Sequence, residues 1–215
     1  MARAAQAVGR DPDAVRLVAV TKGHPLEAIE AALEAGLTHL GENRVEELEE
    51  KVSAVGPGRA TWHMIGHLQS RKAPRAVEVA HLIHSVDSLP LAEKLSRVAG
   101  ERGGEMRVLA QVNTAGEEAK SGLDAGAAVD VVLRMAELPH LRVDGLMTMA
   151  PFVDDEEILS SAFRRLRETL EEVRRHDRAV GGELSMGMTN DLEIAIREGS
   201  TMVRIGTALF GERAR

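Results

Sequence analysis

Short apolar runs alternate along the chain with longer segments whose apolar residues recur at helical spacing. The eight apolar runs are predicted to be strands: Leu17–Val20, Thr38–Leu40, Thr61–Ile65, Leu82–His84, Arg107–Val112, Leu141–Met147, Glu183–Met186 and Met202–Ile205. The segments between them set an apolar face against a polar one, as amphipathic helices do; examples are Leu26–Ala35, Leu89–Ala99, Ala125–Glu137 and Glu156–His176. The pattern predicts strand and helix in regular alternation.

This alternation predicts a fold class. Strands that are separated by helices pair in parallel through right-handed crossovers. Eight such units close most economically into a single (β/α)8 barrel of the TIM type, with a doubly wound open sheet as the alternative. Only sixteen residues precede the first strand, so we expect a short or trimmed N-terminal helix. No repeat or Pro/Gly/Ser-rich linker divides the chain, and we expect one domain over residues 1–215.

Composition narrows the classes of function. The chain has no cysteine, which removes disulfides, thiolate nucleophiles and cysteine-ligated metals and fits a reducing compartment. A net charge of −7 and an aromatic content of 2% argue against nucleic-acid binding. The first residues lack the apolar core of a signal peptide, and no run reaches the length of a membrane span. We therefore expect a cytoplasmic protein that holds no metal and binds neither nucleic acid nor membrane.

Lys22 ends the first apolar run, just before Gly23 and Pro25. An ammonium group beside such a run costs several kcal/mol unless it is paired or loses its charge. A lysine forced neutral becomes a nucleophilic amine, which is how a Schiff-base lysine is made. The alternative is that Lys22 extends past the strand end into water.

Further polar residues follow the other predicted strands. In a (β/α)8 barrel the strand C-termini and the loops after them build the active face, so these residues converge in space. They are Glu42, Asn43, His63 to His67, Ser85, Asn113, Met147 to Met149, Ser185 to Met188 and Arg204 to Thr207. Barrels frequently bind a phosphate on the loops after the last two strands, so a phosphate-bearing aldehyde would suit this face. The glycines there could instead be ordinary turn residues, and Arg204 could pair with a buried glutamate.

Several motifs fall at these positions: Val18-Ala19-Val20-Thr21-Lys22 with Pro25, Gly41-Glu42-Asn43, Trp62 to Lys72, Lys120-Ser121-Gly122, Gly145-Leu146-Met147, Ser185 to Asp191, and Gly199 to Thr207. Together they resemble the YggS-type pyridoxal-phosphate homeostasis proteins. The resemblance runs from about Gly9 to Gly211. Two features depart from it: Arg71 stands where the family pattern has asparagine, and the shortened N-terminal helix could weaken barrel closure.

The resemblance implies a barrel similar to the N-terminal domain of alanine racemase, carrying pyridoxal 5′-phosphate (PLP) on a lysine. The implied cofactor-binding residues are Lys22 for the Schiff base, Ser185, Gly206 and Thr207 for the phosphate, Arg204 for the pyridine nitrogen, and Asn43, His63 and Met64 for the ring. An arginine at that nitrogen keeps it unprotonated and makes the cofactor a weak electron sink.

The function that follows is PLP homeostasis: storage, delivery or buffering of the cofactor without robust catalysis. Racemisation needs an acid/base group on each face of the substrate carbon. In the racemases that the chain resembles, the second group is a tyrosine of another domain, and this chain has no tyrosine. An amino-acid racemase or slow lyase is the alternative, with His63 or His67 as the second base. A scaffold protein with an empty barrel is a third hypothesis.

The expected partners are PLP itself and, as recipients, the apo forms of PLP enzymes. We expect a monomer or weak dimer. Lys120 offers a second exposed amine for transient capture of the cofactor, although a solvated loop lysine is the simpler interpretation.

Overall fold

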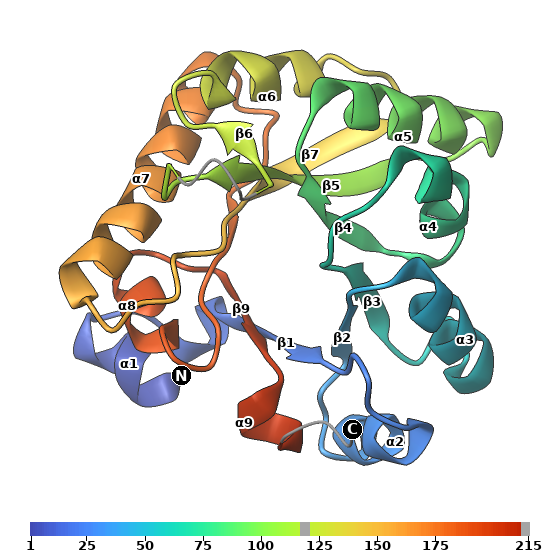
Figure 1. The fold of residues 1–215 in the computed structure, drawn as a ribbon, viewed down its shortest axis with the longest axis horizontal. Helices are drawn as coiled ribbons and strands as arrows, with labels where there is room; N and C mark the ends of the chain where they lie inside the picture. Colours follow the sequence, from blue (N-terminus) through green and yellow to red (C-terminus); the bar gives the residue numbers. More distant parts are fainter. Residues whose placement is uncertain (117–120, 212–215) are drawn as a thin grey trace.

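A computed structural model describes residues 1–116 and 121–211 of the chain (Figure 1). Its strands are β1 (Arg16–Val20), β2 (His39–Glu42), β3 (Thr61–Met64), β4 (Leu82–Val86), β5 (Met106–Asn113), β6 (Leu123–Asp124), β7 (Leu141–Met147), β8 (Glu183–Ser185) and β9 (Met202–Ile205). Its helices are α1 (Ala2–Ala7), α2 (Leu26–Glu34), α3 (Val45–Val55), α4 (Ala73–Val79), α5 (Leu89–Glu101), α6 (Ala128–Ala136), α7 (Glu156–His176), α8 (Leu192–Arg197) and α9 (Thr207–Phe210).

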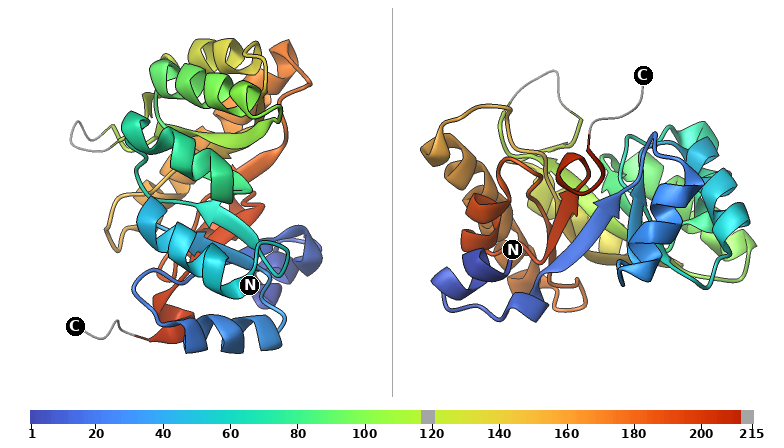
Figure 2. Two further views of the ribbon diagram at one scale, coloured as in Figure 1. Left: turned by 90° about the vertical axis from the view of Figure 1, so that its right-hand side faces the viewer. Right: turned by 90° about the horizontal axis from the view of Figure 1, so that it is seen from below.

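Eight of the nine strands close into a ring. Around it run β1, β2, β3, β4, β5, β7, β8 and β9, and β9 returns to β1; every neighbouring pair is parallel. The seam between β9 and β1 is seen between the red and blue strands of Figure 2. The predicted (β/α)8 barrel is therefore confirmed, and the alternative prediction of a doubly wound open sheet is wrong.

The predicted strands all form, with small shifts at their ends. The bounds of β7 and β9 agree with the prediction, while β2 continues past Leu40 to Glu42. The extra strand β6 pairs with the end of β5 outside the ring. Its two residues are too few to show an alternating pattern, so sequence reasoning could not find it.

Strand residues alternate between the helical layer and the barrel interior, as the two-residue period of a strand requires. Leu40, Trp62 and Ile83 face outward and join the main core beneath the helices. A separate apolar cluster is formed by Val18, Leu82, Leu109, Met147 and Met202. These two layers hold the strand ends in place.

The N-terminal helix is short, as expected, and has a buried face. Ala4 and Ala5 of α1 pack in a small cluster with Ile196 of α8, and Figure 1 shows the two helices side by side. Arg10 donates hydrogen bonds to the carbonyl oxygens of Ile196 (2.7 Å) and Ser200 (2.8 Å). Since β1 and β9 pair over four residues, the short helix does not interrupt closure of the barrel.

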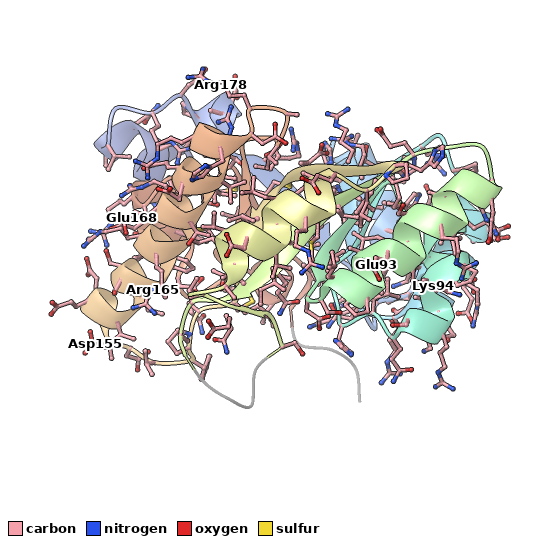
Figure 3. All side chains as sticks on the ribbon, turned by 90° about the horizontal axis from the view of Figure 1, so that it is seen from above. Glu93, Lys94, Asp155, Arg165, Glu168 and Arg178 are labelled. Carbon is pink, nitrogen blue, oxygen red and sulfur yellow. The ribbon has the colours of Figure 1, made fainter. Side chains whose placement is uncertain are left out.

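The longest helix, α7, covers one side of the barrel. The Asp155 carboxylate caps its first turn by accepting from the backbone N–H of Glu157 and Ile158. Figure 3 shows Asp155 at one end of the helix and Arg178 beyond the other. Acidic residues in the first turn and basic ones in the last suit the helix dipole. No helix in the described part of the chain is both long and apolar enough to cross a membrane.

Candidate functional site

A cavity of about 470 Å³ lies at the C-terminal end of the barrel strands, within the usual size range of small-molecule sites. Loops after six of the ring strands contribute to it. The lining residues are Val20, Lys22, Asn43, Ile65, Gly66, His67, Gln111, Met149, Ala150, Pro151, Phe152, Met188, Thr189, Asn190, Asp191, Arg204, Gly206 and Thr207. The site therefore gathers residues that are distant in sequence.

The loop that carries Lys22 is tied to α3 on both sides of the lysine. The buried Lys51 ammonium donates to the Thr21 carbonyl oxygen (2.7 Å) and to Oε1 of Glu47 (2.6 Å). The same Glu47 oxygen accepts from the backbone N–H of Gly23 at 2.6 Å. These contacts fix the backbone before and after Lys22, whose side chain is half-buried at the cavity.

Glu42 completes this buried cluster of charges. Its Oε1 accepts from Lys51 (2.7 Å) and from the Thr21 hydroxyl (2.5 Å). Burial raises the pKa of the Glu42 carboxyl, against the opposing effect of both hydrogen bonds. Oε2 is buried and finds no hydrogen-bond partner in the described residues. Lys51 is therefore the cation that makes burial of this carboxyl group tolerable.

Arg204, at the inner face of β9, forms the floor of the cavity. Its Nη1 donates to the carbonyl oxygen of Ser185 (2.8 Å) and to Oγ of Ser185 (2.6 Å), and Nη2 donates to the Thr148 carbonyl oxygen (2.9 Å). Burial lowers the pKa of Arg204 to about 10, while the nearby Asp191 carboxylate opposes this. The guanidinium is therefore charged at neutral pH. Within residues 1–116 and 121–211 it forms no ion pair with a glutamate.

The loop after β8 is a tight turn that brings Thr189 and Asn190 to the cavity. Gly187 has φ of +99°, and a Cβ atom there would lie 2.7 Å from Cβ of Ala195. The Asp191 carboxylate accepts from the backbone N–H of Met188 at 2.5 Å. Gly206 and Thr207 at the start of α9 also line the cavity, while the N–H groups of Leu209 and Phe210 bond to the Gly206 carbonyl oxygen.

Five predicted site residues line the cavity: Lys22, Asn43, Arg204, Gly206 and Thr207. Three do not. Met64 faces outward into the main core, whereas its neighbour His63 points into the barrel interior. Adjacent strand residues face opposite ways, so the two side chains reach different layers of the barrel. Ser185 is fully buried beneath the Arg204 guanidinium. None of the three is among the residues that line the cavity, and their assignment to cofactor binding stays a prediction.

Sequence reasoning missed other lining residues. The candidate stretches ended at Met149 and Met188, and extending each loop by three residues would have added the lining residues Ala150 to Phe152 and Thr189 to Asp191. Gly66 lay within the candidate stretch His63 to His67, and a Cβ atom there would lie 2.3 Å from the carbonyl oxygen of Asn43. That close approach holds Asn43 at the cavity.

Two other predicted positions fall elsewhere. Lys120 lies outside the described residues. Arg71 is exposed, donates to Oε1 of Gln69 at 3.0 Å, and is not among the residues that line the cavity.

Comparison with known proteins agrees with the barrel and its motifs. A family model described as the alanine racemase N-terminal domain matches residues 2–214. A pyridoxal phosphate homeostasis protein of Pseudomonas aeruginosa is 41% identical over 211 residues, covering 98% of this chain and 90% of the relative. The chain belongs to the family of pyridoxal phosphate homeostasis proteins.

Another pyridoxal phosphate homeostasis protein, from Aquifex aeolicus, is 38% identical over 98% of this chain and 92% of its own length. The structure of PipY from Synechococcus elongatus, solved with PLP bound, aligns with a TM-score of 0.87 and 38% identity. The alignment covers 97% of this chain and 98% of PipY. The family assignment thus rests on nearly the whole chain.

Proposed function

We propose that this protein binds PLP in the cavity and serves PLP homeostasis by storing, delivering or buffering the cofactor. One observation carries the proposal. A half-buried lysine after β1 meets a charged arginine of β9 and the Gly206–Thr207 segment that follows β9 around one cavity of about 470 Å³. The relatives from Aquifex aeolicus and Pseudomonas aeruginosa are both called pyridoxal phosphate homeostasis proteins, which supports this proposal.

The residues present fit the chemistry of the cofactor. PLP supplies an aldehyde that condenses reversibly with amines and a ring that withdraws electrons. Lys22 offers the amine. Thr189, Gly206 and Thr207 offer donors for the phosphate, and Asn43 lies where it would flank the ring. The Arg204 guanidinium can only donate, so the ring nitrogen that meets it must accept and stay unprotonated.

The geometry favours a carrier over a racemase or lyase. His63 is committed to hydrogen bonds inside the barrel and does not reach the cavity. Among the described residues His67 is the one histidine that lines the cavity, and its Nδ1 lies 3.2 Å from Oδ2 of Asp87. The racemase alternative therefore rests on His67 alone as the second base. A cytoplasmic, single-domain protein that passes PLP to apo enzymes remains our expectation.

Reconstitution tests the proposal. The protein is incubated with PLP, and we expect a visible absorbance band that borohydride abolishes, with the mass increase on Lys22. Lys22→Ala should lose the band and keep the fold, whereas Lys94→Ala on α5 (Figure 3) serves as the matched control and should keep both. An unchanged band in Lys22→Ala would overturn the site. Alanine racemisation at ordinary enzyme rates, lost in His67→Gln, would favour the enzyme instead.

A further inference from the structure

A chain of hydrogen bonds crosses the barrel interior and ends at the floor of the cavity. His39 Nδ1 lies 3.0 Å from His63 Nε2, and His63 Nδ1 lies 2.8 Å from His84 Nε2. His84 Nδ1 lies 2.9 Å from Oγ of Ser185, which also accepts from Arg204 at 2.6 Å. These residues come from β2, β3, β4, β8 and β9. Three buried contacts and one partly buried contact thus connect the start of β2 to the arginine of the cavity.

The direction of this chain is determined by its last member. Arginine carries donors only, so Oγ of Ser185 must accept from Arg204. In the described residues the other partner of that hydroxyl is His84. If the hydroxyl also accepted from His84, its own proton would have no acceptor among the described residues, so we infer that it donates to His84 Nδ1 and that this nitrogen is unprotonated. A neutral imidazole carries its proton on the other nitrogen, so His84 Nε2 donates to His63 Nδ1.

The same reasoning passes to the next ring. His63 Nδ1 accepts, so its Nε2 carries the proton and donates to Nδ1 of His39. Both His63 and His84 use both of their nitrogens within the chain. Burial lowers the pKa of both imidazoles well below the ordinary value; the positive charge of Arg16 adds to this at both rings, and that of Arg204 adds to it at His84. A neutral form agrees with the hydrogen-bond geometry.

Metal binding does not explain the cluster. The imidazoles are joined in a line, each nitrogen facing the next ring or a hydroxyl. Among the described residues no group of three His, Asp or Glu side chains is arranged to hold a metal ion. The arrangement is that of a hydrogen-bond relay.

We propose that Ser185, His84 and His63 form a one-way hydrogen-bond relay that positions Arg204, with both imidazoles neutral and protonated at Nε2. They are positioning residues, because none of them lines the cavity. Nη1 of the guanidinium is held by Ser185, the end of the relay, while Nη2 is held separately by the Thr148 carbonyl oxygen. The proposed role toward the ligand rests on the proposed function: the fixed arginine presents a donor to the PLP ring nitrogen and disfavours ligands protonated there.

Nitrogen NMR of the protein without PLP tests the relay independently of the cofactor. Two-bond ¹H–¹⁵N correlation spectra, assigned with His63→Gln and His84→Gln, distinguish a protonated from an unprotonated ring nitrogen. We expect Nδ1 unprotonated and Nε2 protonated in both rings at neutral pH. A proton on Nδ1 of either ring would overturn the proposal, and so would a doubly protonated ring.

A serine pair then tests the positioning role. Ser185→Ala removes the hydroxyl that sets the direction, and we expect altered His84 signals and PLP binding weakened roughly tenfold. Ser96→Ala is the matched control, since Ser96 is also buried and donates to the Pro139 carbonyl oxygen at 2.5 Å. It should change neither the histidine signals nor PLP binding. Equal effects of the two variants on PLP binding would reduce Ser185 to a structural residue and overturn the positioning role.

The two proposals fail in different ways. If wild-type protein shows no visible band with PLP, the proposed function fails while the NMR spectrum still decides the relay. If PLP binds and the imidazoles carry their protons on Nδ1, the relay fails and the function stands.

Discussion

The barrel interior contains an apolar cluster and a polar relay, which share the strands β4 and β9 and draw their other members from different strands. Val18, Leu82, Leu109, Met147 and Met202 form the first; His39, His63, His84, Ser185 and Arg204 form the second. On β4 and β9 the two sets lie two residues apart, Leu82 before His84 and Met202 before Arg204. The two sets differ in their effect on the structure: one contributes mainly to stability, and the other to the orientation of a side chain.

Apolar contacts have no direction. Burial of such side chains contributes about 25 cal/mol per Å² whichever way they face, and swaps that keep the volume are tolerated. A buried hydrogen bond contributes a net of only about 0.5–1.5 kcal/mol, yet loss of one partner leaves the other unsatisfied at about 1–3 kcal/mol. The apolar cluster therefore stabilises the barrel, while the relay fixes the orientation of one arginine.

Lys51 extends the comparison to a buried charge, and its removal should have the largest effect. Lys51→Met leaves Glu42 buried without its cation, which we expect to destabilise the protein by about 3–5 kcal/mol. Urea unfolding measures this. Lys72→Met is the control, because Lys72 pairs with Glu46 at the surface and should cost less than about 1 kcal/mol. Similar losses for both variants would contradict the role assigned to burial.

The apolar cluster should respond to volume and not to chemistry. Leu109→Ala creates a cavity, which we expect to cost about 2–5 kcal/mol, whereas Leu109→Met should cost less than about 1.5 kcal/mol. Chemical denaturation gives both values. The histidine tautomers should be unchanged in Leu109→Met. A tautomer shift in that variant would show that the two halves of the interior are coupled and would break the comparison.

Lowering the pH should reduce the free energy of unfolding because the two relay histidines are buried in the neutral form. Burial lowers the pKa of His63 and of His84 below the unfolded value of about 6.5. Above that pH both histidines are neutral in the folded and in the unfolded chain, so neither makes the free energy of unfolding depend on pH. Below it only the unfolded chain takes up protons, so stability falls by roughly 1.4 kcal/mol per pH unit for each histidine.

The groups that face the two rings include His39, His81, Arg16, Arg107 and Arg204. Urea unfolding between pH 6.5 and 5.5 should therefore show a smaller slope with pH in His63→Gln. The exposed His176, which pairs with Glu172, provides the control variant His176→Gln. An unchanged slope in His63→Gln would argue that this ring takes up its proton in the folded state.

Sequence periodicity predicted the fold because each ring strand carries a strong apolar signal. It also placed Lys22, Asn43, Arg204, Gly206 and Thr207 at the end of the barrel that forms the cavity, since each lies near or just beyond the C-terminal end of a strand. Periodicity shows which residues alternate and leaves open which face is the interior. Ser185 and Arg204 both point inward, at different depths, and only the closed barrel shows that one lies beneath the other.

The burial of Lys51 could not be predicted from the sequence either. Its helix carries many charges, and a lysine there is typical of a solvated face. In the structure Lys51 is 5% exposed because Glu42 and Glu47 converge on its ammonium group from β2 and α3. A residue four positions from Glu47 gives a helical pair, but the contact with β2 depends on how α3 packs.

Substitution of Arg71, which lies outside both the apolar cluster and the relay, should have the smallest effect on stability and on PLP affinity. It departs from the pattern of the family, yet its side chain is exposed and bonds only to Gln69 among the described residues. Arg71→Asn should therefore change the free energy of unfolding by less than about 0.5 kcal/mol. PLP affinity, measured by absorbance titration, should stay within about twofold, because the charge at the loop surface is screened by salt. A larger, salt-sensitive change in affinity would mean that Arg71 reaches the bound phosphate, and the rim would then belong to the site.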